Sequence, residues 1–122
     1  MCADQAKKFF NDNIQAQTKT TVIAPPSYID HYDAKENVCY VAIVQFDSID
    51  GGKTITTSTG VFDAFENTSY ANYVWTSDKT KKYWQVKPAW CTVSPPGLPD
   101  VICKSGDEFN DLVEKYFGLH IQ

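Results

Sequence analysis

The residues whose types could carry acid–base chemistry gather in the segment DHYD at positions 30–33. An imidazole between carboxylates can act as a general acid or base, because histidine titrates near neutral pH. Such a site also needs a nucleophile, and none of the serines lies in an elbow motif such as GxSxG. A small hydrolase is therefore a secondary hypothesis, and an exposed polar turn explains the segment equally well. The candidate catalytic residues under this hypothesis are Asp30, His31, Asp33 and, from the segment FDAFE, Glu66.

No signature of a metal or cofactor site accompanies these residues. The two histidines, His31 and His120, lie outside any HExxH arrangement, and the cysteines form no CxxC pair. The sequence also lacks an EF-hand loop and a nucleotide-binding glycine loop. We therefore expect neither a bound metal nor a cofactor.

The charge pattern argues against a nucleic-acid partner. All eleven basic residues are lysine, and the net charge is −4 with an isoelectric point near 5.0. Arginine is the usual residue for bidentate recognition of phosphates and base edges, so its absence counts against nucleic-acid binding. The basic cluster of Lys79, Lys81 and Lys82 is interpreted as a solvated turn or edge strand.

Aromatic residues, at 14% of the chain, offer a second kind of site. Tyr70, Tyr73 and Trp75 fall in one predicted strand and Tyr83, Trp84 and Trp90 in the next, so antiparallel pairing would bring their rings side by side. Aromatic rings anchor both protein and glycan ligands. Of this set, Tyr73, Trp75, Trp84 and Trp90 are the candidate binding residues, and packing of the same rings in the core is the alternative.

Four cysteines without zinc-like spacing predict a disulfide framework. Cys91 and Cys103 flank a segment rich in proline and glycine, which predicts two short extended arms around a turn, so we pair these two. Of the three possible pairings, this one leaves Cys2 for Cys39. Two alternatives remain: Cys2 is the lipidated first residue of a bacterial lipoprotein, or all four thiols are free in a cytosolic protein.

A disulfide framework predicts an extracytoplasmic compartment, either secreted or periplasmic. No stretch of the sequence approaches the roughly 18 apolar residues that a membrane-spanning helix needs, so no transmembrane segment is expected. Met1, directly before Cys2, is interpreted as a start that replaces a signal peptide.

Hydrophobic periodicity predicts one α+β domain over residues 1–122. An N-terminal helix is expected over Ala3–Ile14. A C-terminal amphipathic helix is expected to begin with a capping box of Ser105 and Glu108 and to end at Gly118. The helices should cover one face of a four- to five-stranded, mostly antiparallel sheet. No internal repeat or linker is expected.

Runs of β-branched and aromatic residues between polar turns predict the strands of that sheet. Val38–Phe46 is apolar on both parities and should be the central strand, buried on both faces. An edge strand is expected around Thr20–Ile23, and the chain must turn after it at Pro25-Pro26. A turn at Asp50-Gly51-Gly52 should lead into a strand Thr54–Phe62, which is followed by a strand Tyr70–Thr76. The last expected strand is Lys82–Val93, in which Pro88 requires an edge position or a bulge.

Several segments of the sequence resemble those of a known protein family. They are the opening CADQAKKFF, the segment HYDAKENVCYV, the words VFDAFE and KKYWQVKPAWC, and the ending ICKSGDEFNDLVEKYF. Through them the chain resembles an uncharacterised family of small extracytoplasmic bacterial proteins with four cysteines. The resemblance implies a precursor with a signal peptide and the same four cysteines, and it supplies no activity and no functional residues.

Three functions are consistent with these observations. The leading hypothesis is a secreted or periplasmic, non-enzymatic binding or inhibitory module for a protein or glycan partner. The second is the small hydrolase around His31. The third is a self-associating structural domain, in which a threonine-rich edge strand such as Thr54–Thr59 pairs with a copy of itself.

Overall fold

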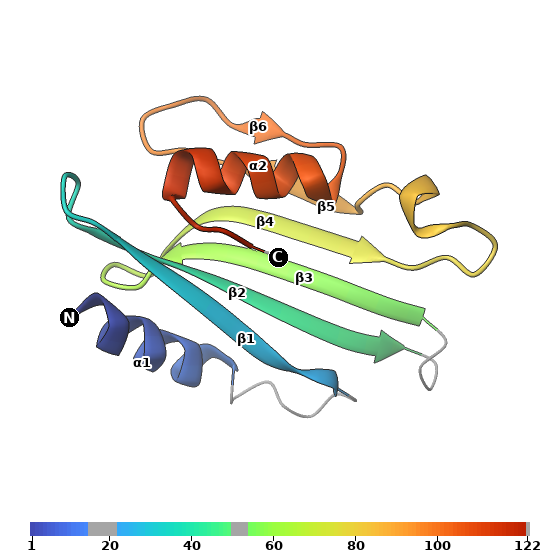
Figure 1. Ribbon diagram of the computed structural model, residues 1–122, viewed down its shortest axis with the longest axis horizontal. Coiled ribbons are helices and arrows are strands. Elements are labelled where there is room, and N and C mark those ends of the chain that lie inside the picture. The colour runs from blue at the N-terminus through green and yellow to red at the C-terminus, as the bar shows by residue number, and fades with distance from the viewer. Residues whose placement is uncertain (15–21, 50–53, 122) are drawn as a thin grey trace.

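The chain folds into an antiparallel sheet of six strands with a helix on each face. The computed structural model describes residues 1–14, 22–49 and 54–121. The strands follow chain order across the sheet, so each strand pairs with its neighbour in sequence (Figure 1). The α+β class is confirmed, with six strands in place of the expected four to five. The elements are α1 (Cys2–Ile14), β1 (Val22–Asp33), β2 (Val38–Ile49), β3 (Thr54–Asp63), β4 (Thr68–Thr76), the 3-10 helix η2 (Tyr83–Gln85), β5 (Trp90–Val93), β6 (Val101–Ile102) and α2 (Gly106–Phe117).

The strand β2 belongs to the cores on both faces of the sheet. Successive side chains of a strand point to opposite faces. Cys39, Val41 and Ile43 pack in the cluster around α1, whereas Tyr40 and Ala42 pack in the cluster around α2. All five side chains are at most 5% exposed. The prediction of a strand buried on both faces is confirmed.

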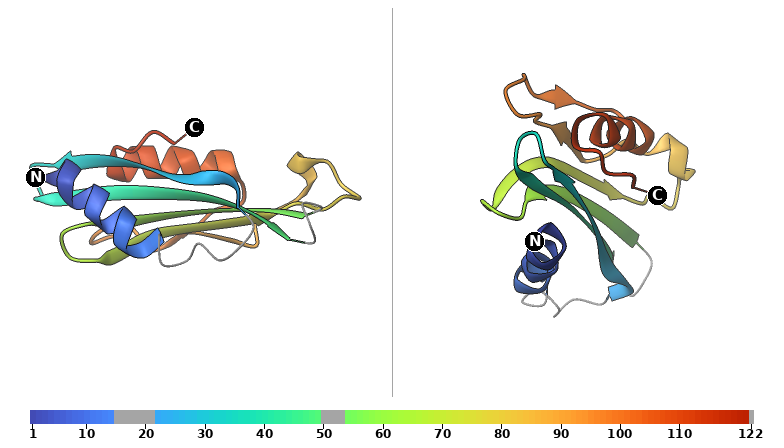
Figure 2. Two further views of the ribbon diagram at one scale, coloured as in Figure 1. Left: turned by 90° about the horizontal axis from the view of Figure 1, so that it is seen from below. Right: turned by 60° about the vertical axis from the view of Figure 1, so that its left-hand side comes forward.

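The two helices lie on opposite faces of the sheet, and the expectation that both would cover one face is wrong. Helix α1 packs on β1 and β2, and α2 packs on β4 and β5. Figure 2 shows the sheet passing between them. The physical reason lies in β2, because a strand that is apolar on both parities needs cover on both sides.

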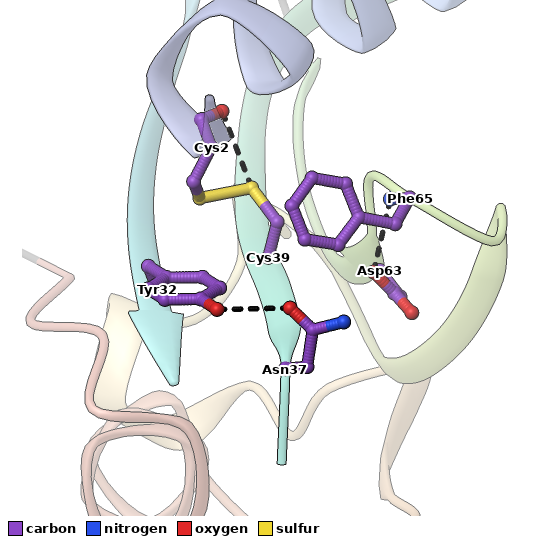
Figure 3. The surroundings of a disulfide bond; sticks show 6 residues. All are labelled: Cys2, Tyr32, Asn37, Cys39, Asp63 and Phe65. Atoms are coloured by element: carbon purple, nitrogen blue, oxygen red, sulfur yellow. Dashed lines mark hydrogen bonds between the residues drawn. A yellow bond between two sulfur atoms is a disulfide. The ribbon is translucent and has the colours of Figure 1, made fainter. Parts of the chain in front are cut away.

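A disulfide from Cys2 to Cys39 ties the first turn of α1 to β2, as predicted (Figure 3). The rings of Tyr32 and Phe65 lie beside this bond, with their centroids 6.4 Å apart. Phe9 is buried farther along the same helix. A lipid anchor would be attached through a thioether to the Cys2 sulfur. Because that sulfur is bonded to Cys39, the structure does not support the lipid-anchor alternative.

The second predicted disulfide, from Cys91 to Cys103, joins β5 to the residue after β6. It closes the two extended arms that the proline- and glycine-rich turn predicted. No cysteine is free, so the alternative of four free thiols is wrong.

Helix α2 begins and ends where the sequence predicts. The Ser105 hydroxyl accepts a hydrogen bond from the Glu108 backbone N–H at 3.1 Å, and Gly118 closes the helix with a left-handed φ of 68°. The Glu108 carboxylate accepts the N–H of Lys104 at 3.4 Å, one residue before the position that a capping box uses. The buried side of the helix consists of Phe109, Val113 and Phe117.

The β1–β2 and β3–β4 hairpins close with the same turn. Residues 33–44 (DAKENVCYVAIV) and 63–74 (DAFENTSYANYV) share the pattern DAxENxxYxxxV. Oδ1 of Asp33 and of Asp63 accepts the N–H two residues farther on, at 3.0 and 2.9 Å. Asn37 and Asn67 take positive φ angles of 53° and 64°. The chain therefore does contain a short internal repeat, contrary to expectation.

The repeat also places equivalent tyrosines in the core. The rings of Tyr40 and Tyr70 meet edge to face with centroids 5.7 Å apart, and both pack on Phe117 of α2. Burial is the largest cause that raises the pKa of Tyr40 to about 12, and Tyr70 and nearby carboxylates raise it further. The two hairpins thus share one anchor on α2.

Two expectations about β1 are wrong. Residues 30–33 form the last part of this strand instead of a turn, and His31 pairs with Tyr40. Pro25-Pro26 does not end the strand, because the β1–β2 register shifts there and β1 is an edge strand, where proline is tolerated. Thr20, Thr21 and the predicted turn at 50–52 lie outside the described residues.

Two other strands also differ from expectation. Of the predicted strand Lys82–Val93, only its last four residues form β5, because η2 and then Pro88 interrupt the extended chain. The threonine-rich segment Thr54–Thr59 belongs to β3, between β2 and β4. It is therefore not an edge, and its backbone is not available to pair with a copy of itself.

Candidate functional site

The structure does not bring the predicted catalytic residues into one site. Asp30 and His31 are neighbours in β1 and so point to opposite faces of the sheet. Asp33 serves the β1–β2 turn, and Glu66 is exposed in the β3–β4 turn. His31 instead lies against the end of α2, where a β-carbon added at Gly118 would come within 2.8 Å of the imidazole ring.

The described part of the chain, residues 1–14, 22–49 and 54–121, holds no group of three or more His, Cys, Asp or Glu side chains that could bind a metal ion. In the same residues, no helix is long and apolar enough to cross a membrane.

The four aromatic residues predicted to bind a ligand divide between the two faces of the sheet. Tyr73 pairs with Cys91 on the face that α2 covers, whereas Val74 pairs with Trp90 on the other face. The expectation that Trp84 and Trp90 share one strand face is wrong, because Trp84 lies in η2. Tyr73, Trp75 and Trp84 converge, and Trp90 does not join them.

The converging rings line a groove of about 560 Å³ at the end of the sheet where α2 begins. Grooves that the described residues form beside α1 and beside the C-terminal residues are smaller, at about 310 and 350 Å³. We call the groove of about 560 Å³ the aromatic groove. It is lined by Tyr73, Trp75, Tyr83, Trp84, Val86, Lys87, Pro88, Lys104, Ser105, Gly106 and Asp107.

Strand β4 supplies the floor of the aromatic groove. The Tyr73 ring packs on Phe109 with centroids 5.2 Å apart. A β-carbon at Gly106 would approach the Tyr73 hydroxyl to 3.1 Å, so a glycine at this position leaves room for the ring against the first turn of α2. Burial and, to a smaller extent, Asp107 raise the pKa of Tyr73, so its hydroxyl keeps its proton as a donor. The Trp75 indole N–H donates to the Val86 carbonyl at 3.0 Å, which fixes that ring.

The segment between β4 and β5 forms the outer wall and projects past the sheet (Figure 1). It opens with a turn in which the Asp78 carboxylate accepts two hydrogen bonds from Thr80, at 2.7 and 2.9 Å, and these lower the pKa of Asp78. In η2 the rings of Tyr83 and Trp84 meet edge to face, 5.0 Å apart. The Lys82 ammonium lies 5.2 Å from the centre of the Trp84 ring.

These two rings have no evident structural role. Tyr83 is 73% and Trp84 is 63% exposed. Within the residues that the structure describes, neither the Tyr83 hydroxyl nor the Trp84 indole N–H forms a hydrogen bond to the protein. Aromatic rings that are held in place but left in solvent are typical of a contact surface for a ligand.

The sequence identified Tyr83 as one of the aromatic residues that could contact a ligand, but it did not identify Lys87 or the first turn of α2 as part of a site. The α2 side of the groove comes from residues 104–107, about 30 residues away from β4, and only the folded sheet places them there.

Comparisons with protein-family models, with curated proteins and with solved structures give no significant match. Function is therefore argued from the groove itself.

Proposed function

We propose that this protein is an extracytoplasmic, non-enzymatic glycan-binding module whose binding site is the aromatic groove. The observation that carries the proposal is the exposed pair of Tyr83 and Trp84 above the half-buried rings of Tyr73 and Trp75. The apolar C–H faces of a sugar ring pack on such aromatic faces, while its hydroxyls need polar partners.

The lining of the groove offers those polar partners. The Tyr73 hydroxyl, Lys87, Lys104 and Asp107 lie among the aromatic rings, so donors and acceptors alternate with apolar surface. A protein partner is better served by anchors at the centre of a broad patch that excludes water. The mixture of aromatic and polar side chains in the lining favours a glycan over a protein.

Binding without hydrolysis fits the distribution of carboxylates. Glycosidases ordinarily use two carboxylates, about 5 to 10 Å apart, on either side of the scissile bond. Among the lining residues of the groove, Asp107 carries the one carboxylate. The candidates Asp30, Asp33 and Glu66 are not part of the lining.

The compartment is part of the proposal. Two disulfides suit an oxidising environment: one ties α1 to β2, and the other joins β5 to the residue after β6.

The test is affinity electrophoresis in gels that contain one polysaccharide each: laminarin, xylan, hydroxyethyl cellulose or polygalacturonate. The chain offers a matched pair of variants, because Trp84 and Trp90 are 63% and 60% exposed but lie at different sites. We expect at least one polymer to retard the wild type and Trp90→Ala equally. Trp84→Ala should bind that polymer at least about tenfold more weakly, since it loses a central aromatic contact.

Two results would overturn the proposal. One is that none of the polymers retards the wild type. The other is that Trp90→Ala loses retardation while Trp84→Ala keeps it, which would move the binding surface to the opposite face.

A further inference from the structure

The aromatic groove lies at a locally basic end of an acidic protein. The wall segment, residues 77–89, contains four lysines and one aspartate, a net charge of +3, whereas the whole chain carries −4. Lys87 lines the groove on this side, and Lys104 lines it on the α2 side. Lys82 sits over the Trp84 ring at the rim.

The acidic residues near this end are largely engaged. The Asp78 carboxylate accepts both hydrogen bonds that Thr80 donates. Glu108 accepts the Lys104 backbone N–H, and Asp107 and Glu108 complement the positive end of the α2 dipole. These carboxylates keep their negative charge, but residues 104–108 contribute only a net −1, so together with the +3 of the wall segment the two sides of the groove carry +2.

The acidic charge of the molecule is concentrated at the other end of the sheet. Residues 30–37 and 63–67 contain five carboxylates and one lysine, a net charge of −4. The ten residues of β3 separate the two ends, a distance of roughly 33 Å at about 3.3 Å per residue. At physiological salt, charges are screened over about 8 Å, so the acidic charges at the far end of the sheet have little effect on a ligand in the groove.

We infer that the glycan is anionic: a polysaccharide that carries carboxylate or sulfate groups along its chain. The rings of Tyr83 and Trp84 pack against sugar faces, and the ammonium groups of Lys82, Lys87 and Lys104 pair with the anionic groups. Lysine suits this task because its charge sits on a flexible stem and can follow a polymer whose charges are not fixed in one geometry. The inference rests on the proposed function and names its ligand class.

The test compares one polymer with and without its charge. Binding of polygalacturonate and of its fully methyl-esterified form is measured by isothermal titration calorimetry at pH 6.5 and 150 mM salt. Dextran sulfate and dextran form a second pair that separates sulfate from carboxylate recognition. We expect at least one charged polymer to bind about tenfold or more tightly than its neutral partner.

The double variant Lys87→Gln/Lys104→Gln should weaken binding of the charged polymer about five- to tenfold. The control Lys7→Gln/Lys8→Gln makes the same change of charge on the exposed side of α1 and should change affinity less than about twofold. Circular dichroism of both variants shows that the fold is retained.

Three results would overturn the inference. If charged and neutral forms bind equally, the groove binds neutral glycan and the proposed function survives without the inference. If the Lys7/Lys8 control loses as much affinity as the groove variant, attraction is general and not located at the groove. If no polymer of either pair binds and the neutral panel also fails, the proposed function falls with it.

Discussion

The two ends of the sheet use their exposed aromatic rings differently: Tyr32 and Phe65 at one end are 45% and 39% exposed, whereas Tyr83 and Trp84 at the other are 73% and 63% exposed. At the hairpin end, which we define as the turns 34–37 and 64–67 with the Cys2–Cys39 disulfide, Tyr32 and Phe65 lie beside the sulfur atoms (Figure 3). The Tyr32 hydroxyl donates to the Asn37 side chain at 2.8 Å. At the groove end, Tyr83 and Trp84 contact each other and line the groove, and most of each side chain is left in solvent.

The difference shows which rings stability explains and which it does not. At the hairpin end, the side chains cover a disulfide, close turns and satisfy backbone groups. At the groove end, the same residue types stand on a wall held in place from behind by the Trp75–Val86 hydrogen bond. A ring that contributes little to folding and is nevertheless held in place is the better candidate for binding.

Removing the disulfide of the hairpin end should have the largest effect on stability. The double variant Cys2→Ser/Cys39→Ser opens a loop with a sequence separation of 37. Chain entropy then lowers the free energy of unfolding by about 3 to 4 kcal/mol. Urea denaturation measures it. Glycan affinity should be unchanged below the unfolding transition, because the groove lies at the other end of the sheet. A loss of affinity in a folded variant would contradict the separation of the two ends.

Alkaline pH should weaken the core next to the hairpin end. The pKa of Tyr40 is raised to about 12 in the folded protein, first by burial and then by Tyr70 and by the carboxylates of Asp33 and Asp63. In the unfolded chain the pKa is about 10. Between these values the folded state keeps a proton that the unfolded state has lost. Stability is therefore complete below about pH 10 and then falls by up to about 1.4 kcal/mol per pH unit.

Urea denaturation between pH 9 and pH 11.5 checks this profile. Tyr40→Phe removes the titrating hydroxyl and should flatten the decline. The exposed Tyr83, at the groove end, supplies the matched variant Tyr83→Phe, which should keep the wild-type profile. Equal profiles for the wild type and Tyr40→Phe would assign the alkaline loss to another group.

The sequence predicted the elements that depend on local patterns. The burial of β2 on both faces follows from its run of apolar residues at both odd and even positions. Helix α2 follows from the helical spacing of its apolar residues, from the Ser105 cap and from the glycine after its last turn. Both disulfides followed from the spacing of four cysteines. Each strand or helix depends on a pattern of about a dozen neighbouring residues, and the disulfides depend on the number and spacing of the cysteines.

The aromatic groove could be predicted only in part, because it depends on long-range geometry. Trp75 and Trp84 were identified from their residue type, but their convergence requires η2 to break the predicted strand before Trp90. The placement of α1 and α2 on opposite faces depends on which side of β2 each helix covers. The repeated turn was missed although DAKEN and DAFEN are identical at four of five positions, because the strand residues that follow them differ at most positions.

The smallest effect on stability is expected at the groove itself. Trp84→Ala removes a ring that is mostly in solvent, so the free energy of unfolding should change by no more than about 0.5 kcal/mol. Urea denaturation of this variant beside Trp90→Ala measures it. A loss of several kcal/mol would give the Trp84 ring a structural role and remove the main reason to assign it to ligand binding.

The measurement that tests the central claim most directly is a map of amide and indole N–H shifts in two-dimensional ¹H–¹⁵N NMR spectra during titration with hexagalacturonate. We expect changes in the indole N–H signals of Trp75 and Trp84 and in the amides of residues 82–87 and 104–107. Residues 33–37 and 63–67 and the Trp90 indole should stay unchanged. Shifts that gather at the hairpin end or on the Trp90 face would contradict the assignment of the aromatic groove as the binding site.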